Sequence, residues 1–309
     1  MVADMKRIKV GGVLPASAVA LGCMRINALD TAEAAALLNA AVDGGVDFFD
    51  HADIYGGGES ERVFARAVKA AGIPRDKMII QTKCGIRPGV CFDFSREHIL
   101  SSVEESLKRL DTDYVDVLLL HRPDTLMEPE EVAEAFDRLH AAGKVRYFGV
   151  SNQNPMQMEL LSAWLHQKLI ANQLQFGPAH TGMIDAGIHV NMLDAASTVR
   201  DGGVLEYCRL KDITIQPWSP FQFGFFEGLF LDSDRYGELN RVLRELAEAK
   251  GVGVNAMVMA WILRHPAQMQ PIAGTTKAAR LTEICRGAEA ELTREEWYAV
   301  YKAAGNILP

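Results

Sequence analysis

Four ionisable side chains follow short apolar runs, and together their types suit one kind of chemistry. Asp50 and Tyr55 come just after an apolar pair, and Lys83 and His121 each end a later apolar run. A carboxylate, a phenol, an amine and an imidazole at one place could supply the general acid that proton transfer to a carbonyl oxygen needs. Taken singly, these residues have simpler interpretations. Asp50 could cap a helix, Lys83 could reach solvent, and His121 could be a packing residue. A catalytic site is therefore predicted only if the fold brings the four together.

The alternation of apolar runs and amphipathic stretches predicts that fold. Short apolar or β-branched runs alternate with stretches whose apolar positions recur at helical spacing. The expected strands are 19–23, 46–49, 78–83, 115–120, 145–150, 170–175, 213–218 and 270–274. With no linker between them, they predict a single α/β domain over residues 1–309, a (β/α)8 TIM barrel. A doubly wound sheet is the alternative, but no G-x-G-x-x-G turn follows the first run.

The two ends of the chain depart from the repeat. Residues 7–15 predict a short hairpin that closes the barrel floor, and residues 293–305 predict an extra terminal helix. Capping residues and glycines mark several helix boundaries. We expect helices to begin at Thr31 and Ser95 and to end at Gly44, Gly72 and Gly143.

Composition and charge narrow the class of function. The 309 residues carry a formal net charge of −8 without any long basic run, which argues against a nucleic-acid partner. The first residues lack the apolar core of a secretory signal, and no apolar stretch approaches the roughly 20 residues of a membrane span. Five scattered cysteines predict reduced thiols and a cytoplasmic location. No CxxC or HExxH spacing occurs, so no metal is expected.

Four spaced segments resemble the successive signatures of the aldo-keto reductase superfamily. They are "GGVDFFDHADIYGGGESE", "QTKCG", "LKRLDTDYVDVLLLHRPD" and "GKVRYFGVSN", and the first resembles the bacterial oxidoreductase branch. The resemblance runs in order from about residue 8 to about residue 304, and each motif falls where a strand is expected to end. It implies reversible hydride transfer between NADPH and a carbonyl compound or alcohol.

The resemblance also implies the catalytic roles. Tyr55 would donate a proton to the carbonyl oxygen, and a buried ammonium on Lys83 would lower the pKa of that phenol. Asp50 would pair with Lys83 and fix its direction, while His121 would hydrogen-bond and orient the carbonyl. His51, which stands where the family commonly has a threonine, is expected to turn away from Asp50 and serve in packing.

For the cofactor, the resemblance implies NADP(H) rather than NAD, held across the barrel mouth. Amide side chains would bind the nicotinamide carboxamide, Trp218 would stack on the ring in place of the family's usual tyrosine, and a glycine–threonine turn at 274–276 would hold the 2′-phosphate. Ile284, where an asparagine is common, removes one adenine contact. The expected cofactor-binding residues are Gly22, Cys23, Met24, Asp50, Ser151, Asn152, Gln173, Trp218, Ser219, Pro220, Phe221, Gly274, Thr275, Thr276, Lys277, Arg280 and Glu283.

The partner expected from the sequence is a small or medium aldehyde or ketone, because the chain after the last barrel helix is short. The loop at 84–94 either lines the substrate pocket or packs over the barrel, and Cys84 is expected to be an inert thiol. The sequence leaves the oligomeric state open. An alternative function is a regulatory subunit that binds NADPH and turns over slowly. A cofactor-free hydrolase or lyase is a further alternative, but the sequence offers it no nucleophile–base pair.

Overall fold

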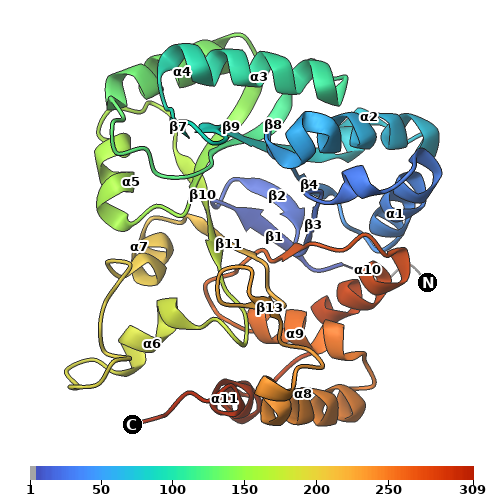
Figure 1. The fold of residues 1–309 in the computed structure, drawn as a ribbon, viewed down its shortest axis with the longest axis vertical. Coiled ribbons are helices and arrows are strands. Elements are labelled where there is room, and N and C mark those ends of the chain that lie inside the picture. Colours follow the sequence, from blue (N-terminus) through green and yellow to red (C-terminus); the bar gives the residue numbers. More distant parts are fainter. Residues whose placement is uncertain (1–4) are drawn as a thin grey trace.

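The computed structural model describes residues 5–309 and contains a parallel sheet curled into a barrel (Figure 1). The eight strands pair in the order β11-β10-β9-β8-β5-β4-β3-β14, and the backbone amide of Gln270 donates 3.0 Å to the carbonyl of Ile215 at the remaining seam. The strands are β3 (Ala20–Gly22), β4 (Phe48–Asp50), β5 (Ile79–Cys84), β8 (Val115–Leu120), β9 (Val145–Ser151), β10 (Leu169–Gln175), β11 (Thr214–Trp218) and β14 (Ile272–Ala273). The predicted TIM barrel is confirmed, with each strand within two residues of its expected position.

Helices surround the strands, as Figure 1 shows, and their apolar faces cover the sheet. They are α1 (Thr31–Asp43), α2 (Glu59–Ala71), α3 (Arg96–Leu110), α4 (Pro129–Ala141), α5 (Pro155–Ser162), α6 (Gly182–Ile188), α7 (Val204–Leu210), α8 (Gly237–Lys250), α9 (Val254–Leu263), α10 (Ala278–Cys285) and α11 (Arg294–Ala303). Short 3-10 turns span Ile26–Ala28, Tyr55–Gly58, Arg75–Lys77, Asp234–Tyr236 and Arg286–Ala288.

The expected boundaries of α1 agree with the structure, but its capping residues differ in detail. The N-cap of α1 is Asp30 rather than Thr31, because the Asp30 carboxylate accepts from the amide of Glu33 in a capping box. At the other end of α1, Gly45 and not Gly44 takes the left-handed conformation, with φ of 77°. The other starts and ends agree with expectation: the Ser95 side chain accepts from the amide of His98, and Gly72 and Gly143 have φ of 67° and 69°.

The predicted N-terminal hairpin is present and closes the barrel at the starts of its strands. Strands β1 (Arg7–Val10) and β2 (Leu14–Ser17) pair antiparallel. At the hairpin tip, the amide of Gly11 donates 2.9 Å to the hydroxyl of Thr214, the first residue of β11. A Cβ at Gly11 would lie 2.4 Å from that of Ile170, so only glycine permits this approach. The hairpin therefore shuts the floor and leaves the opposite end open.

The predicted terminal helix, α11, packs outside the barrel against α8 and α9. The rings of Trp297 in α11 and Trp261 in α9 stack with centroids 4.8 Å apart, and each indole N–H donates 3.0 Å to the other's backbone carbonyl. Two further two-stranded pieces lie in loops: β6 (Ile86–Arg87) with β7 (Cys91–Phe92), and β12 (Gln222–Phe223) with β13 (Gly228–Leu229). No single helix within residues 5–309 is long and apolar enough to cross a membrane. Residues Asp234–Lys250 and α9 together have the length and composition of a membrane span, but a bend of 92° separates the two segments.

Candidate active site

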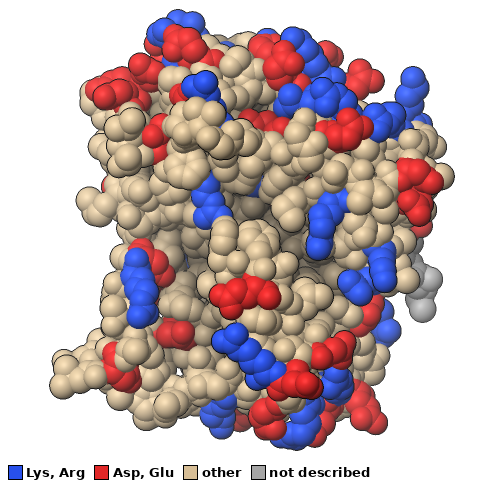
Figure 2. Space-filling model, viewed as in Figure 1, with Lys and Arg blue, Asp and Glu red and all other residues tan. Residues whose placement is uncertain are grey.

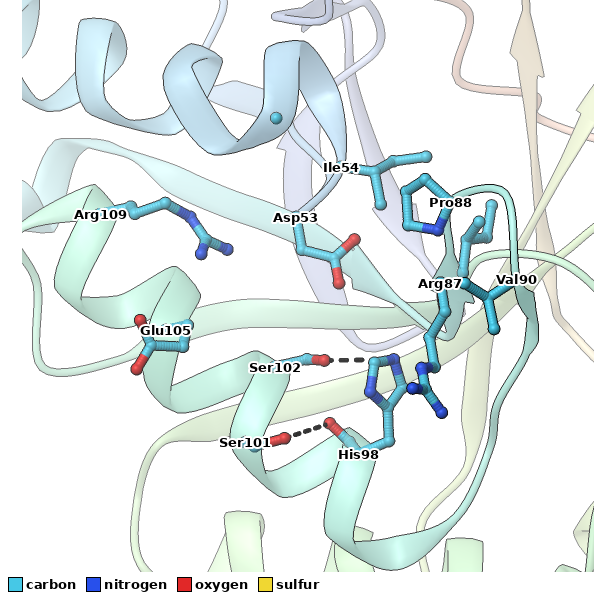
Figure 3. A pocket seen from close by; sticks show the side chains of 12 residues that line it. Asp53, Ile54, Arg87, Pro88, Val90, His98, Ser101, Ser102, Glu105 and Arg109 are labelled. Carbon is cyan, nitrogen blue, oxygen red and sulfur yellow. Dashed lines mark hydrogen bonds between the residues drawn. The ribbon is translucent and has the colours of Figure 1, made fainter.

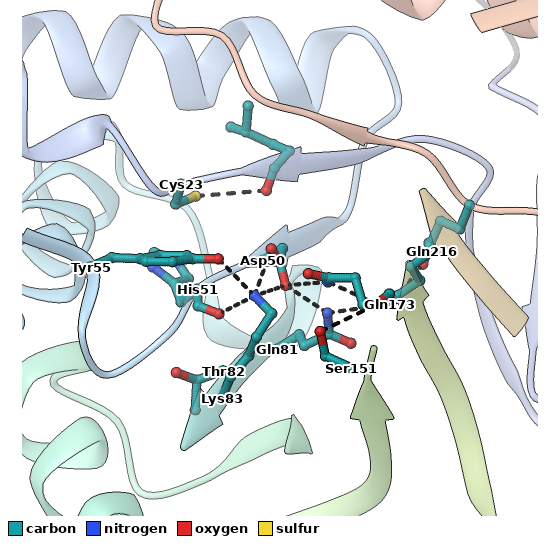
Figure 4. A network of polar contacts seen from close by, with 12 residues as sticks. Cys23, Asp50, His51, Tyr55, Gln81, Thr82, Lys83, Ser151, Gln173 and Gln216 are labelled. Carbon is teal, nitrogen blue, oxygen red and sulfur yellow. Dashed lines mark hydrogen bonds and ion pairs between the residues drawn. The ribbon is translucent and has the colours of Figure 1, made fainter. Parts of the chain in front are cut away.

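At the open end of the barrel, Lys83 lies between Asp50 and Tyr55 (Figure 4). Its ammonium is 2.8 and 2.9 Å from the two Asp50 carboxylate oxygens and 3.2 Å from the Tyr55 hydroxyl, and it also donates 2.7 Å to the carbonyl of His51. The Lys83 side chain is fully buried. A buried ammonium needs a charge partner and filled donor positions, and this lysine has both. Asp50, Tyr55 and Lys83 thus meet at one rim of the barrel, as expected from the sequence.

The protonation of the group follows from burial and charge. Burial alone would lower the pKa of Lys83, but the Asp50 carboxylate and the Tyr55 phenol together raise it. Burial raises the pKa of Tyr55, and the Lys83 ammonium acts in the opposite direction without reversing it. Lys83 therefore acts on the pKa of Tyr55 in the expected direction, but burial outweighs it and the net shift is upward. The Asp50 carboxylate adds to the upward shift, because its negative charge disfavours the phenolate.

His121 completes the cluster from β8. Its ring meets the ring of Tyr55 edge-on, with centroids 5.9 Å apart, and its backbone amide donates 2.9 Å to the carbonyl of Cys84. Burial, helped by the charges of Lys83 and Arg122, sets the pKa of His121 well below its usual value, so the imidazole is neutral. Nδ1 of this ring is buried and contacts no hydrogen-bond partner among residues 5–309.

A three-glycine turn delivers Tyr55 to the mouth. Gly56, Gly57 and Gly58 all have left-handed backbone angles, with φ of 57°, 64° and 86°. At Gly58 a Cβ would lie 2.8 Å from Cδ of Arg109, a residue of α3. Arg109 in turn donates 2.6 Å to the fully buried carboxylate of Glu61, which also accepts 2.7 Å from the Thr82 hydroxyl. The turn is therefore fixed between α3 and β5.

Beneath Asp50, a column of four buried glutamines runs down the inside of the barrel, and Figure 4 labels three of them, Gln81, Gln173 and Gln216. Gln81 and Gln173 donate to Oδ1 of Asp50 at 2.6 and 3.0 Å, and both also donate to Gln216 at 2.9 and 3.2 Å. Gln216 donates 2.9 Å to Gln270, whose amide donates 2.8 Å to the carbonyl of Ser17 at the floor. Of these four glutamines only Gln173 was expected from the sequence to have a role, that of binding the nicotinamide.

The predicted nicotinamide-binding residues lie together at the ends of β9, β10 and β11. The Ser151 hydroxyl donates 3.2 Å to the Gln173 carbonyl and accepts 2.7 Å from the Asn152 amide. The Trp218 indole donates 3.2 Å to the Asn152 side chain. Asn152 and Ser219 both have positive φ, 57° and 49°, as the chain leaves its strand. These contacts join the ends of β9, β10 and β11 into one polar edge.

An aromatic loop covers Trp218. The ring of Phe226 stacks on the indole at 5.7 Å, and Phe225 meets it edge-on at 6.2 Å. At the base of this loop, Pro220 packs so closely on Gly177 that a Cβ there would lie 2.3 Å from the Pro220 carbonyl oxygen. The amide of Phe230 donates 3.1 Å to the carbonyl of Phe221 and closes the loop. One face of the predicted stacking residue is thus occupied by Phe226.

The two remaining predicted cofactor segments lie side by side, because β3 pairs with β14. Gly22 packs on Ile272, and Arg25 in the loop after β3 donates 2.6 Å to the carbonyl of Gly274. Cys23 is buried and its amide donates 2.9 Å to the carbonyl of Asp50, whereas Met24 is partly exposed. Arg25 was not expected from the sequence, although its position one residue past Met24 could have indicated it.

At the start of α10, a turn presents the predicted phosphate-binding residues. The hydroxyl of Thr275 accepts 3.1 Å from the amide of Lys277, and a Cβ at Gly274 would make only an ordinary contact, 3.8 Å from the Arg25 guanidinium. Thr276 and Arg280 flank this turn. Glu283 lies further along α10, and its carboxylate accepts from the backbone and side chain of Asn255 at 2.9 and 3.0 Å. Its part in cofactor binding stays a prediction.

Beside this cluster, a separate cavity of about 510 Å³ opens between the Tyr55 loop, β6 and α3 (Figure 3). Asp53 points into it, and one of its carboxylate oxygens is buried without a partner among residues 5–309. Burial and the charge of Glu61 raise the pKa of Asp53 to about 7. Tyr55 does not line this cavity.

His51, next to Asp50 in sequence, packs edge-on against Phe64 at 4.4 Å, and burial lowers its pKa to about 3.

Comparison with known proteins decides the family. The model of the aldo/keto reductase family matches residues 18–304. The chain belongs to the aldo/keto reductase family. This family member is 37% identical to the uncharacterized oxidoreductase YcsN of Bacillus subtilis, over 97% of this chain and 98% of the relative. It is 34% identical to the 6-dehydroglucose reductase of Agrobacterium fabrum, again over 97% and 98% of the two chains.

A solved structure supports the same assignment. The aldo-keto reductase Tm1743, crystallised with the inhibitor epalrestat, superposes with a TM-score of 0.77 at 26% identity, covering 97% of this reductase and 100% of that chain. The resemblance seen in the sequence motifs is therefore confirmed at the level of family and fold. Family membership makes this reductase an oxidoreductase acting on a small molecule. Within residues 5–309 no group of three or more His, Cys, Asp or Glu side chains is placed to hold a metal ion.

Proposed function

We propose that this reductase converts an aldehyde or ketone to the alcohol, with NADPH as the hydride source. The observation that carries the proposal is the placement of the Lys83 ammonium, 2.8 Å from Asp50 and 3.2 Å from the Tyr55 hydroxyl at the barrel mouth. The names of the relatives, an oxidoreductase and a 6-dehydroglucose reductase, support the same reaction class.

Each of the four residues has a role that its surroundings favour. With its pKa raised, Tyr55 keeps its proton at neutral pH and can donate it to a carbonyl oxygen as negative charge develops there. Lys83 stabilises the resulting phenolate, and Asp50 holds Lys83 in position. The neutral imidazole of His121 binds and orients the carbonyl.

The residues at the mouth fit a dinucleotide. When bound, NADPH supplies the hydride. The start of α10, which no side chain caps, offers the backbone amides of its first turn, and Lys277 and Arg280 offer positive charge for its phosphate. The linked side chains of Ser151, Asn152 and Trp218 offer donors and acceptors for the carboxamide end. In the cell we place this reaction in the cytoplasm, in keeping with five unpaired cysteines.

The proposal is tested by Tyr55→Phe, measured as NADPH oxidation across a panel of aldehydes and ketones. Turnover should fall by roughly a thousandfold or more because the proton donor is lost, while NADPH should still quench tryptophan fluorescence. Tyr298→Phe, in α11, is the matched control and should retain turnover. Retained activity in Tyr55→Phe would overturn the mechanism. Binding of NADPH with no turnover of any carbonyl by the parent would instead favour the regulatory-subunit alternative.

A further inference from the structure

We propose that Arg122 binds a carboxylate on the substrate, so that this reductase prefers aldehydes or ketones that carry an acid group. The inference rests on the proposed carbonyl reduction and names its substrate class. Arg122 follows His121 directly, at the mouth end of β8. Its place in the barrel, its surroundings and its lack of a partner each support this role.

The surroundings of Arg122 are aromatic and close to the catalytic groups. Its guanidinium carbon lies 5.7 Å from the ring centroid of Trp218 and 5.6 Å from that of Phe225. Its charge contributes to lowering the pKa of His121. Partial burial lowers the pKa of Arg122, and the nearby phenol of Tyr55 acts in the opposite direction. The guanidinium is therefore near the position that a bound carbonyl would occupy.

Within residues 5–309, Arg122 makes neither an ion pair nor a side-chain hydrogen bond. The acid nearest to it in sequence, Asp124, instead accepts from the amides of Phe94 and Leu126, both at 2.9 Å. By contrast, Arg87 at the neighbouring loop is paired with Asp93. A guanidinium that is partly buried without an anion favours an anionic ligand, because a carboxylate matches its planar fork.

The position of β8 argues for substrate rather than cofactor phosphate. In the eight-membered strand order, β8 lies four places from β14 in either direction, so the two strands are on opposite sides of the barrel. The turn proposed for the 2′-phosphate follows β14. Figure 2 shows a hollow near the centre of this face with basic side chains on either side of it, in a molecule whose net charge is −8. The barrel mouth therefore has two separate basic positions. The residues of the turn after β14 suit the cofactor phosphate, and Arg122 on the opposite side suits a carboxylate of the substrate.

The test compares 4-carboxybenzaldehyde with its neutral methyl ester, which shares the ring and the aldehyde. The quantity measured is the ratio of kcat/KM for the acid to that for the ester, in the parent, Arg122→Met and Arg122→Lys. We expect a ratio above one in the parent, a fall of roughly tenfold or more in Arg122→Met, and partial recovery in Arg122→Lys. Arg138→Met, which removes an exposed guanidinium from α4, is the matched control and should keep the parent ratio.

Two outcomes would overturn the inference: an unchanged ratio in Arg122→Met, or a loss confined to the affinity for NADPH, which would assign Arg122 to the cofactor. Failure of the proposed function looks different, because the parent would then turn over neither aldehyde. In that case calorimetry still tests the anion site, by measuring how tightly terephthalate binds to the complex of the protein with NADPH. Weaker terephthalate binding by Arg122→Met supports the anion site, and equal binding removes it.

Discussion

The side-chain amide of Gln81 donates a 2.6 Å hydrogen bond to Oδ1 of Asp50, the same oxygen that accepts from Lys83. Register explains the contact, because Asp50 and Gln81 are Cα partners across β4 and β5. The carboxylate also fixes which way the amide faces, since the opposite orientation would set two oxygens together. Asp50 is thus held by an amide from below and an ammonium from the side.

Gln81→Leu should lower kcat for carbonyl reduction by roughly ten- to hundredfold, the range expected for losing a hydrogen bond to a charged group. Asp50 would then position Lys83 less firmly, whereas the dissociation constant for NADPH should change little. The matched control is Gln270→Leu, which removes the same amide from the floor end of the column without touching Asp50. Equal losses of kcat in the two variants would show that the column acts only through stability.

The pKa of Asp53, raised to about 7, makes stability depend on pH. An unfolded aspartate ionises near about pH 4, so between about pH 4 and pH 7 the folded chain holds a proton that the unfolded chain has lost. The free energy of unfolding contributed by this group therefore falls as pH rises through that window. Asp53→Asn cannot ionise, and urea unfolding should find it more stable than the parent at pH 8, with a smaller difference at pH 5. The exposed Asp43→Asn serves as control, and a pH-independent difference would contradict the prediction.

The ion pair between Glu61 and Arg109 should be costly to break. Glu61 is fully buried, so Arg109→Met would leave its carboxylate without a counter-charge, at a cost of about 3–5 kcal/mol in the free energy of unfolding. Adding Glu61→Gln removes the buried charge and should restore part of that loss. For comparison, Arg138→Met breaks an exposed pair with Glu134 and should cost about 1 kcal/mol or less. A small effect for Arg109→Met would mean that water reaches Glu61.

The turn before α10 predicts a preference for NADPH over NADH. Arg280→Ala should reduce the ratio of the NADH to the NADPH dissociation constants by roughly tenfold, because a charge-assisted contact to the 2′-phosphate is lost. Fluorescence titration with both cofactors measures this ratio, and the parent's ratio should shrink at high salt. Arg286→Ala is the control, since Arg286 donates to the carbonyl of Gly251 instead. A parent that binds both cofactors equally would remove the preference altogether.

The barrel was predictable because its signals are local. Each apolar run and its following helix can be recognised in a short window, and Asp50, Lys83 and His121 come directly at or after such runs. The glutamine column was not predictable, because Gln81, Gln173, Gln216 and Gln270 are far apart in sequence and meet only when the sheet closes. The ion pair of Glu61 was not predictable either, since its partner Arg109 comes from another helix. The net shift of the Tyr55 pKa depends on burial, which the sequence does not give.

The column beneath Asp50 also determines where protons can travel. Each of its members is a carboxamide, which donates and accepts hydrogen bonds but neither takes up nor releases a proton near neutral pH. The barrel floor is in addition closed by the hairpin. The acid at Tyr55 is therefore insulated from the closed end of the molecule, and after each turnover its proton must be replaced from the side on which substrate enters and product leaves.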